Sequence, residues 1–155
     1  MNQFMKEAIA EAVSGSSCNE GGPFGAVICK NGQIIARGHN EVIKTNDPTA
    51  HAEMVTIRRA SAKLGRFDLS DCELYTSCEP CPMCLSAIYW SRIPVVYYGC
   101  NKKDAADIGF DDDRIYQFIG NPSAQSDVLR LVPMEREGCL PVFAQWRDKQ
   151  DKTMY

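Results

Sequence analysis

Residues 73–98, ELYTSCEPCPMCLSAIYWSRIPVVYY, decide the fold class of this chain. The residues at 73–76 predict a strand, and the prolines near the centre begin a helix that ends before Pro94. The run at 95–98 is rich in β-branched and aromatic residues and predicts a second strand. A strand, a helix and a strand in direct succession are typical of a layered α/β protein.

The residues before this stretch predict a helix and a β-hairpin. Apolar side chains recur at helical spacing over residues 1–14, and the Ser/Gly run at 14–17 is expected to end that helix. Two short apolar runs, 24–29 and 34–36, flank the pair Asn31-Gly32, which favours a tight turn between strands.

Three more helices and a fifth strand complete the predicted order. A helix is expected over residues 50–64, with Thr49 as its N-cap. Residues 111–119 predict another helix, residues 128–132 a fifth strand, and the tail from Phe143 a last helix. A hairpin followed by alternating helices and strands predicts an α/β fold with a mixed sheet.

Length and composition predict one domain over residues 1–155 and exclude several protein classes. The 45% apolar and 24% charged residues are ordinary for a soluble globular protein. A net charge of −3 argues against a protein whose main work is to bind a nucleic acid. Charged residues interrupt residues 1–13, so no signal peptide is expected, and no apolar run approaches the roughly 18 residues that a membrane span needs. We therefore expect a cytoplasmic protein.

In such a protein the eight cysteines are expected to be thiols rather than disulfides, and those at ligand spacing are candidates for metal binding. Cys81 and Cys84 lie three residues apart at the predicted start of a helix, so both sulfurs can face the same way. A helix N-terminus also favours thiolate over thiol. With the imidazole of His51 they make three ligands that suit Zn²⁺, and three protein ligands leave the fourth position to water, as in catalytic zinc sites.

Glu53 is the candidate proton acceptor beside this metal. Because it lies two residues after His51 at a helix start, its carboxylate can be near the ion without binding it. Two thiolates donate charge to zinc, so we expect its water to be less acidic than water on zinc held by three histidines. A neighbouring carboxylate that takes the proton is then required, and Glu53 can supply it.

The cysteines and histidines also allow other interpretations. A Cys-x-x-C motif alone could be a redox pair or half of a structural zinc site, and Cys78 with Cys81 offers a competing register. The pair Cys81 and Cys84 is preferred because Pro80 precedes it, as in the His-x-Glu and Pro-Cys-x-x-Cys signature of zinc base deaminases. His39 is expected to be a loop histidine whose hydrogen bonds are satisfied.

On these motifs the chain resembles the cytidine-deaminase-like superfamily over nearly its whole length, and within it the bacterial guanine deaminases. The superfamily motifs are TAHAE at 49–53 and CEPCPMC at 78–84. The features of the branch are GPFG at 22–25, Asn40, GFDD at 109–112, and a C-terminal helix with Phe143 and Trp146 that ends at Tyr155. The resemblance implies a three-layer α/β/α fold with a five-stranded mixed sheet, and zinc held by His51, Cys81 and Cys84 with Glu53 as proton shuttle.

The resemblance also implies how the substrate and a partner bind. Phe24 would stack on a purine, Asn40 would hydrogen-bond its edge, and Asp112 would accept from its N–H groups. Tyr155 would help to close a lid over the base. The family further implies a homodimer in which a C-terminal segment, about residues 138–155, is exchanged between subunits.

The implied reaction is hydrolytic deamination of guanine to xanthine and ammonia by a zinc-activated water. The acidic run around Asp112 would repel a phosphate and suits a neutral base that presents N–H donors. One alternative is a tRNA adenosine deaminase, which shares both motifs and needs a basic surface. Others are a cytosine or nucleoside deaminase of the same fold, guanosine included, and a non-enzymatic structural-zinc binding module, which predicts four protein ligands.

Overall fold

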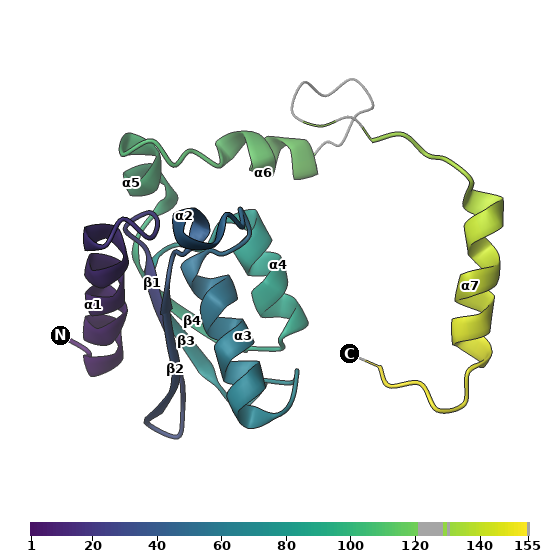
Figure 1. Ribbon diagram of the computed structural model, residues 1–155, viewed down its shortest axis with the longest axis horizontal. Coiled ribbons are helices and arrows are strands. Elements are labelled where there is room, and N and C mark those ends of the chain that lie inside the picture. Colours follow the sequence, from purple (N-terminus) through teal and green to yellow (C-terminus); the bar gives the residue numbers. More distant parts are fainter. Residues whose placement is uncertain (121–128, 130, 155) are drawn as a thin grey trace. The chain divides into compact units, whose positions relative to one another are not determined.

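The computed structural model describes residues 1–120, 129 and 131–154 (Figure 1). The chain divides into two compact units, residues 1–112 and 113–155. The first unit contains α1 (Gln3–Ser17), β1 (Gly25–Lys30), β2 (Gln33–His39), α2 (Val42–Thr45), α3 (Ala52–Leu64), β3 (Glu73–Cys78), α4 (Pro82–Trp90), β4 (Val95–Cys100) and α5 (Lys102–Asp107). The second contains α6 (Asp113–Gly120) and α7 (Arg136–Asp148).

The sheet of the first unit is mixed and has the strand order β2-β1-β3-β4. β1 runs antiparallel to β2 and to β3, whereas β3 and β4 are parallel. The hairpin turns at Asn31 and Gly32, whose positive φ angles of 51° and 75° suit the tight turn that the right-handed strand twist favours. α4 connects the parallel strands, as a crossover between parallel neighbours requires.

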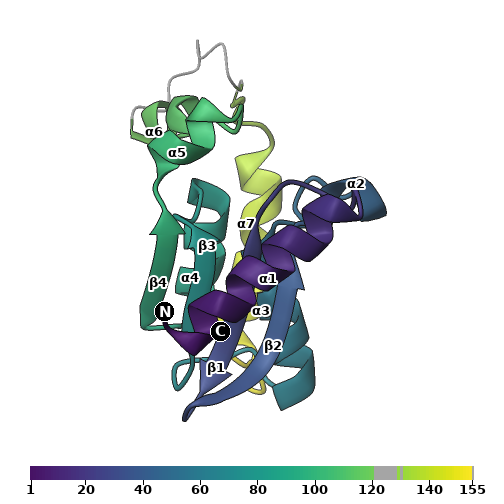
Figure 2. The same cartoon turned by 90° about the vertical axis from the view of Figure 1, so that its left-hand side faces the viewer.

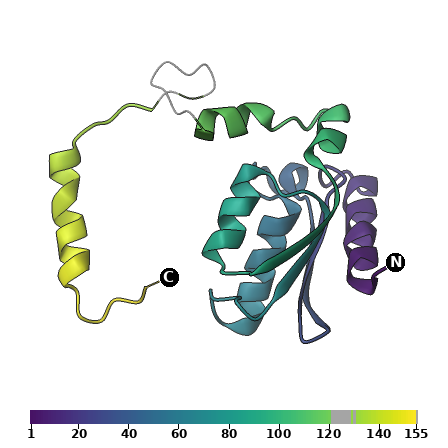
Figure 3. The same cartoon turned by 180° about the vertical axis from the view of Figure 1, so that it is seen from behind.

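Helices cover both faces of this sheet and make three layers. α1 packs on one face, and α3 and α4 lie on the other (Figures 1 and 3). Figure 2 shows α1 crossing the strands. Because it is covered on both sides, β1 is buried along nearly its whole length, and Ile28 of β1 and Leu74 of β3 are fully buried in the core. The predicted α/β class is confirmed.

The prediction of a fifth strand at residues 128–132 was wrong for the described residues of that stretch. Among the described residues the sheet has four strands, and Leu129, Leu131 and Val132 lie in none of them. Val128 and Arg130, also expected in that strand, fall outside the described residues. A strand exists only where a neighbour supplies its hydrogen bonds, and an apolar run does not specify that neighbour.

Several predicted helix boundaries were also wrong. α1 continues through the Ser/Gly run to Ser17, because Gly15 lets His39 pack directly against the helix and Ser16 bonds back to the carbonyl of Ala12. Thr49 does not cap α3. Its backbone and hydroxyl both donate to Asp47, and the residue in the N-cap position is His51.

The described residues of the second unit form two helices, which begin at other residues than expected. α6 begins at Asp113 rather than 111, and α7 begins at Arg136, seven residues before Phe143. α7 carries apolar side chains that are exposed, among them Val142, Phe143 and Trp146. No helix in the described part of the chain combines the length and apolarity needed to cross a membrane.

Candidate metal centre and active site

The starts of two helices bring the candidate metal ligands together. His51 immediately precedes α3, and Cys81 immediately precedes α4. Both have extended backbones, with ψ angles of 158° and 167°, and neither side chain caps its own helix. Cys84 lies in the first turn of α4. The three side chains are therefore free to face one another at two helix N-termini, where negative charge on sulfur is favoured.

The distances suit a single metal ion. The Nδ1 atom of His51 lies 3.6 Å from Sγ of Cys81 and 3.7 Å from Sγ of Cys84. The three donor atoms lie within 4.8 Å of one another. Cys78, the competing ligand, is not in this cluster, and its Sγ lies 3.9 Å from the carbonyl oxygen of Asn101 instead. One imidazole and two sulfurs at this spacing match the ligand set of tetrahedral zinc.

The electrostatics of the two thiols also suit a cation. Hydrogen bonds from Cys84 and His51 hold the pKa of Cys81 well below its usual range. The thiol of Cys84 keeps its proton, because the neighbouring Cys81 sulfur, burial and the nearby Glu53 all raise the pKa of Cys84. A divalent cation would relieve this repulsion and allow both sulfurs to ionise.

Glu53 is buried beside this cluster, with only 6% of its surface exposed. Its Oε1 accepts a hydrogen bond from Thr76 Oγ1 at 3.0 Å, and its Oε2 accepts one from Cys84 Sγ at 3.4 Å. Burial raises the pKa of this carboxyl above its ordinary value, against the effect of these hydrogen bonds. The side chain is thus held in one orientation and is readily protonated, as a proton carrier requires.

The expected substrate contacts lie at the same end of the sheet. Phe24 directly precedes β1 and Asn40 directly follows β2, and the backbone N–H of Asn40 donates to the carbonyl of Phe24 at 2.9 Å. Asp112 is half-buried, and burial together with the negative charge on Cys81 raises its pKa. Tyr155, the fourth expected contact, lies outside the described residues.

Two residues at this end had no role assigned from sequence. Thr76 orients Glu53 from β3, and Phe110 packs edge-on against Phe24, with ring centroids 4.9 Å apart. Phe110 belongs to the GFDD motif, so the motif could have indicated it. For Thr76 the sequence carries no signal, because its contact depends on how α3 lies over β3.

A family model for the cytidine and deoxycytidylate deaminase zinc-binding region matches residues 1–100. The chain belongs to this deaminase family. Zinc is therefore the cofactor of this deaminase, in agreement with the two sulfurs and one imidazole gathered at the helix starts.

Relatives of this deaminase agree with that assignment. Guanine deaminase of Bacillus subtilis (strain 168) is 49% identical over 152 residues, which cover 98% of this chain and 97% of the relative. The X-ray structure of guanine deaminase from Bacillus subtilis has a TM-score of 0.93 and 48% identity, covering 100% of this chain and 99% of that one. A tRNA-specific adenosine deaminase of Aquifex aeolicus is 45% identical over 101 residues, or 64% of this chain and 66% of that protein.

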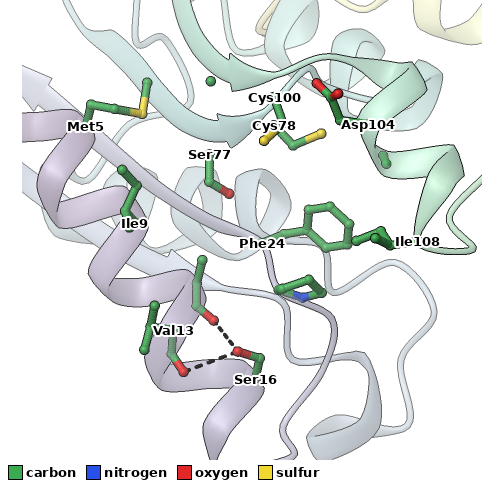
Figure 4. Close-up of a pocket in the computed structure, with 14 residues that line it drawn as sticks. Met5, Ile9, Val13, Ser16, Phe24, Ser77, Cys78, Cys100, Asp104 and Ile108 are labelled. Carbon is green, nitrogen blue, oxygen red and sulfur yellow. Dashed lines mark hydrogen bonds between the residues drawn. The ribbon is translucent and has the colours of Figure 1, made fainter.

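This deaminase also has an apolar hollow of about 680 Å³ on the α1 face of the sheet (Figure 4). Met5, Ile9 and Val13 of α1 form one wall, and Ile108 lies on the opposite side. Phe24 borders it, whereas the three candidate metal ligands are not among its lining residues. The hollow is therefore distinct from the metal cluster.

Proposed function

We propose that this protein is a zinc-dependent guanine deaminase, which hydrolyses guanine to xanthine and ammonia. The observation that carries the chemistry is the buried carboxylate of Glu53 beside one imidazole and two sulfurs. Guanine is favoured as the substrate because the Bacillus subtilis guanine deaminase matches almost the whole chain at 49% identity.

His51, Cys81 and Cys84 would hold the ion. When bound, zinc supplies a Lewis acid that lowers the pKa of a water molecule. Glu53 would take one proton from the attacking water and pass it to a ring nitrogen of guanine as the water oxygen adds to C2. It would then take the second proton from that oxygen and give it to the amino group, which leaves as ammonia when its bond to C2 breaks. Thr76 keeps the carboxylate in place during both transfers through its hydrogen bond to Oε1.

Three described residues would orient the base. Phe24 stacks on the purine ring, and its own edge-on contact with Phe110 fixes the ring plane. Asn40 hydrogen-bonds the edge of the base. Asp112 accepts from the N–H groups that guanine presents at N1 and at the 2-amino group. Such contacts select a neutral purine base over a phosphorylated ligand.

A panel of candidate substrates tests this function. We expect ammonia release from guanine with a kcat/KM at least about a hundredfold above that for guanosine, adenine, cytosine and cytidine. Adenosine-containing tRNA should be neither bound in a gel shift nor deaminated, because the chain has a net charge of −3. Faster turnover of a nucleoside or of tRNA would contradict the proposal, and zinc-loaded protein that releases no ammonia would favour a structural zinc site.

The enzyme would be a cytoplasmic homodimer in which the C-terminal segment of each copy packs on the other. Two features of the first unit support the binding of another chain to it. No described residue pairs with the outer edge of β4, and the apolar hollow borders α1. The exposed apolar side chains of α7 match these surfaces in character. The C-terminal segment of a second copy, about residues 138–155, is therefore the proposed occupant. The eight free thiols suit a reducing compartment.

Mass measurement by light scattering tests the dimer. The wild-type chain should have twice the monomer mass of 17.3 kDa. Phe143→Asp, which places a charge on the exposed apolar face of α7, should shift the protein towards monomer, because an unpaired charge is costly at an apolar interface. Gln145→Asp adds the same charge at an exposed polar position of that helix and should remain dimeric. A monomeric wild-type chain, or equal masses for both variants, would contradict this assembly.

A further inference from the structure

His39 occupies an unusual position between two carboxylates at the end of β2. Its Nδ1 atom lies 3.0 Å from Oε2 of Glu11 on α1, and its Nε2 atom lies 2.6 Å from Oε2 of Glu20 in the loop that follows α1. The ring packs against Gly15, where a Cβ atom would stand 2.5 Å from the imidazole. A neutral imidazole has one N–H, so only the imidazolium can donate to both carboxylates.

The other charged groups around this ring balance when His39 is protonated. Glu41 lies 3.7 Å from Nε2 of His39. Lys44 of α2 pairs with Glu20 at 2.9 Å, and Arg59 of α3 pairs with Glu41 at 2.8 Å. The charged groups are thus three carboxylates, Glu11, Glu20 and Glu41, and three cations, His39, Lys44 and Arg59. Loss of the imidazolium proton leaves one uncompensated negative charge in a half-buried cluster.

This cluster supports Asn40 and Phe24, two of the three described residues that we propose as purine contacts. Asn40 follows His39 directly, and its backbone N–H donates to the carbonyl of Phe24. The loop that carries Glu20 also passes Asn40 so closely that a Cβ atom on Gly21 would lie 2.1 Å from Oδ1 of Asn40. The carbonyl oxygen of Glu20 accepts from two backbone N–H groups of α2. The bond between His39 and Glu20 therefore joins the end of β2, which Asn40 directly follows, to the loop bearing Phe24.

We propose that the His39 imidazolium is a positioning residue that holds Asn40 and Phe24 in place for the purine, so that its deprotonation weakens substrate binding without slowing the chemical step. This inference rests on the proposed function. Burial lowers the pKa of His39, but the hydrogen bonds to Glu11 and Glu20 and the negative charges of these two carboxylates together outweigh burial and raise it. A raised pKa means that the stabilisation is complete at low pH and is lost as the pH rises through the pKa of the folded state.

NMR and steady-state kinetics on the zinc-loaded enzyme test this proposal together. The chain has two histidines, so His39→Gln identifies the His39 ring signals by their disappearance. The KM for guanine should rise about tenfold as the pH passes the pKa that NMR measures for His39, because a charge-assisted hydrogen bond is lost. The kcat should show no step at that pH. His39→Gln should have the raised KM at every pH and no step.

Two charge-neutralising variants on α1 make the comparison specific. Glu11 contacts His39, so Glu11→Gln should lower the pKa of the ring and move the KM step to lower pH by the same amount. Glu7 lies one turn earlier and pairs with Arg37 at 2.9 Å, so Glu7→Gln removes the same charge from the same helix. This variant should change neither the pKa of His39 nor the pH of the KM step.

A wild-type KM that stays constant across the His39 titration would overturn the proposal. So would a Glu11→Gln variant whose NMR titration shifts while its KM step does not. Wild-type enzyme that releases no ammonia from guanine at any pH would overturn the proposed function itself, and this inference with it.

Discussion

Glu53→Gln should reduce kcat by about a thousandfold while the protein keeps its zinc. The amide can accept the hydrogen bond of Thr76, so the side chain should stay in place at the end of β3. It cannot take a proton from water or return one to the leaving amine. Ammonia release measures the rate, and elemental analysis of the purified variant measures the zinc.

A matched variant separates this effect from loss of a carboxylate elsewhere. Glu73, at the start of β3, accepts hydrogen bonds from Tyr75 and Cys29 and has no contact with the metal cluster. Glu73→Gln should therefore keep zinc and near-normal turnover. If Glu53→Gln were as active as Glu73→Gln, Glu53 would not be the proton carrier. Loss of zinc in Glu53→Gln would instead show that the carboxylate supports the metal.

Cys84→Ser should lose both zinc and turnover. Cys84 is 1% exposed and lies between His51 and Glu53. A serine hydroxyl is not ionised at neutral pH, so it cannot supply the thiolate ligand that Cys84 would give to zinc. The zinc content should fall from about one ion per chain to near zero. Metal analysis and ammonia release measure the two losses on the same sample.

Cys78→Ser is the matched control, because the sequence alone left open a zinc pair of Cys78 and Cys81. Cys78 is buried, but its sulfur points to the carbonyl of Asn101 rather than to His51. This variant should keep its zinc and most of its activity. If it lost zinc and Cys84→Ser did not, the competing register would be the correct one.

Much of the fold follows from local patterns. The Asn31-Gly32 turn predicts the hairpin because few residues adopt two successive positive φ angles. The proline-bounded helix between two strands predicts α4 and a mixed sheet. The boundaries of α1 and α3 did not follow, since serine and glycine at 14–17 end a helix in isolation, whereas here the contact of Gly15 with His39 keeps them helical.

The sequence by itself determined which side chains are the candidate zinc ligands. His51, Cys81 and Cys84 each lie at a helix start that is specified within a few neighbouring residues, and ligand type and spacing are local properties. The same local signals correctly favoured zinc as the cofactor and the α/β class.

Only the tertiary structure decided which distant side chains meet. Thr76 reaches Glu53 from a different element 23 residues away, and His39 lies between Glu11 and Glu20 only because α1 packs across β2. The same holds for the outer edge of β4, with which no described residue pairs. Such contacts arise from the packing of the whole core, whose free energy is shared among many residues, and so no short stretch of sequence encodes them.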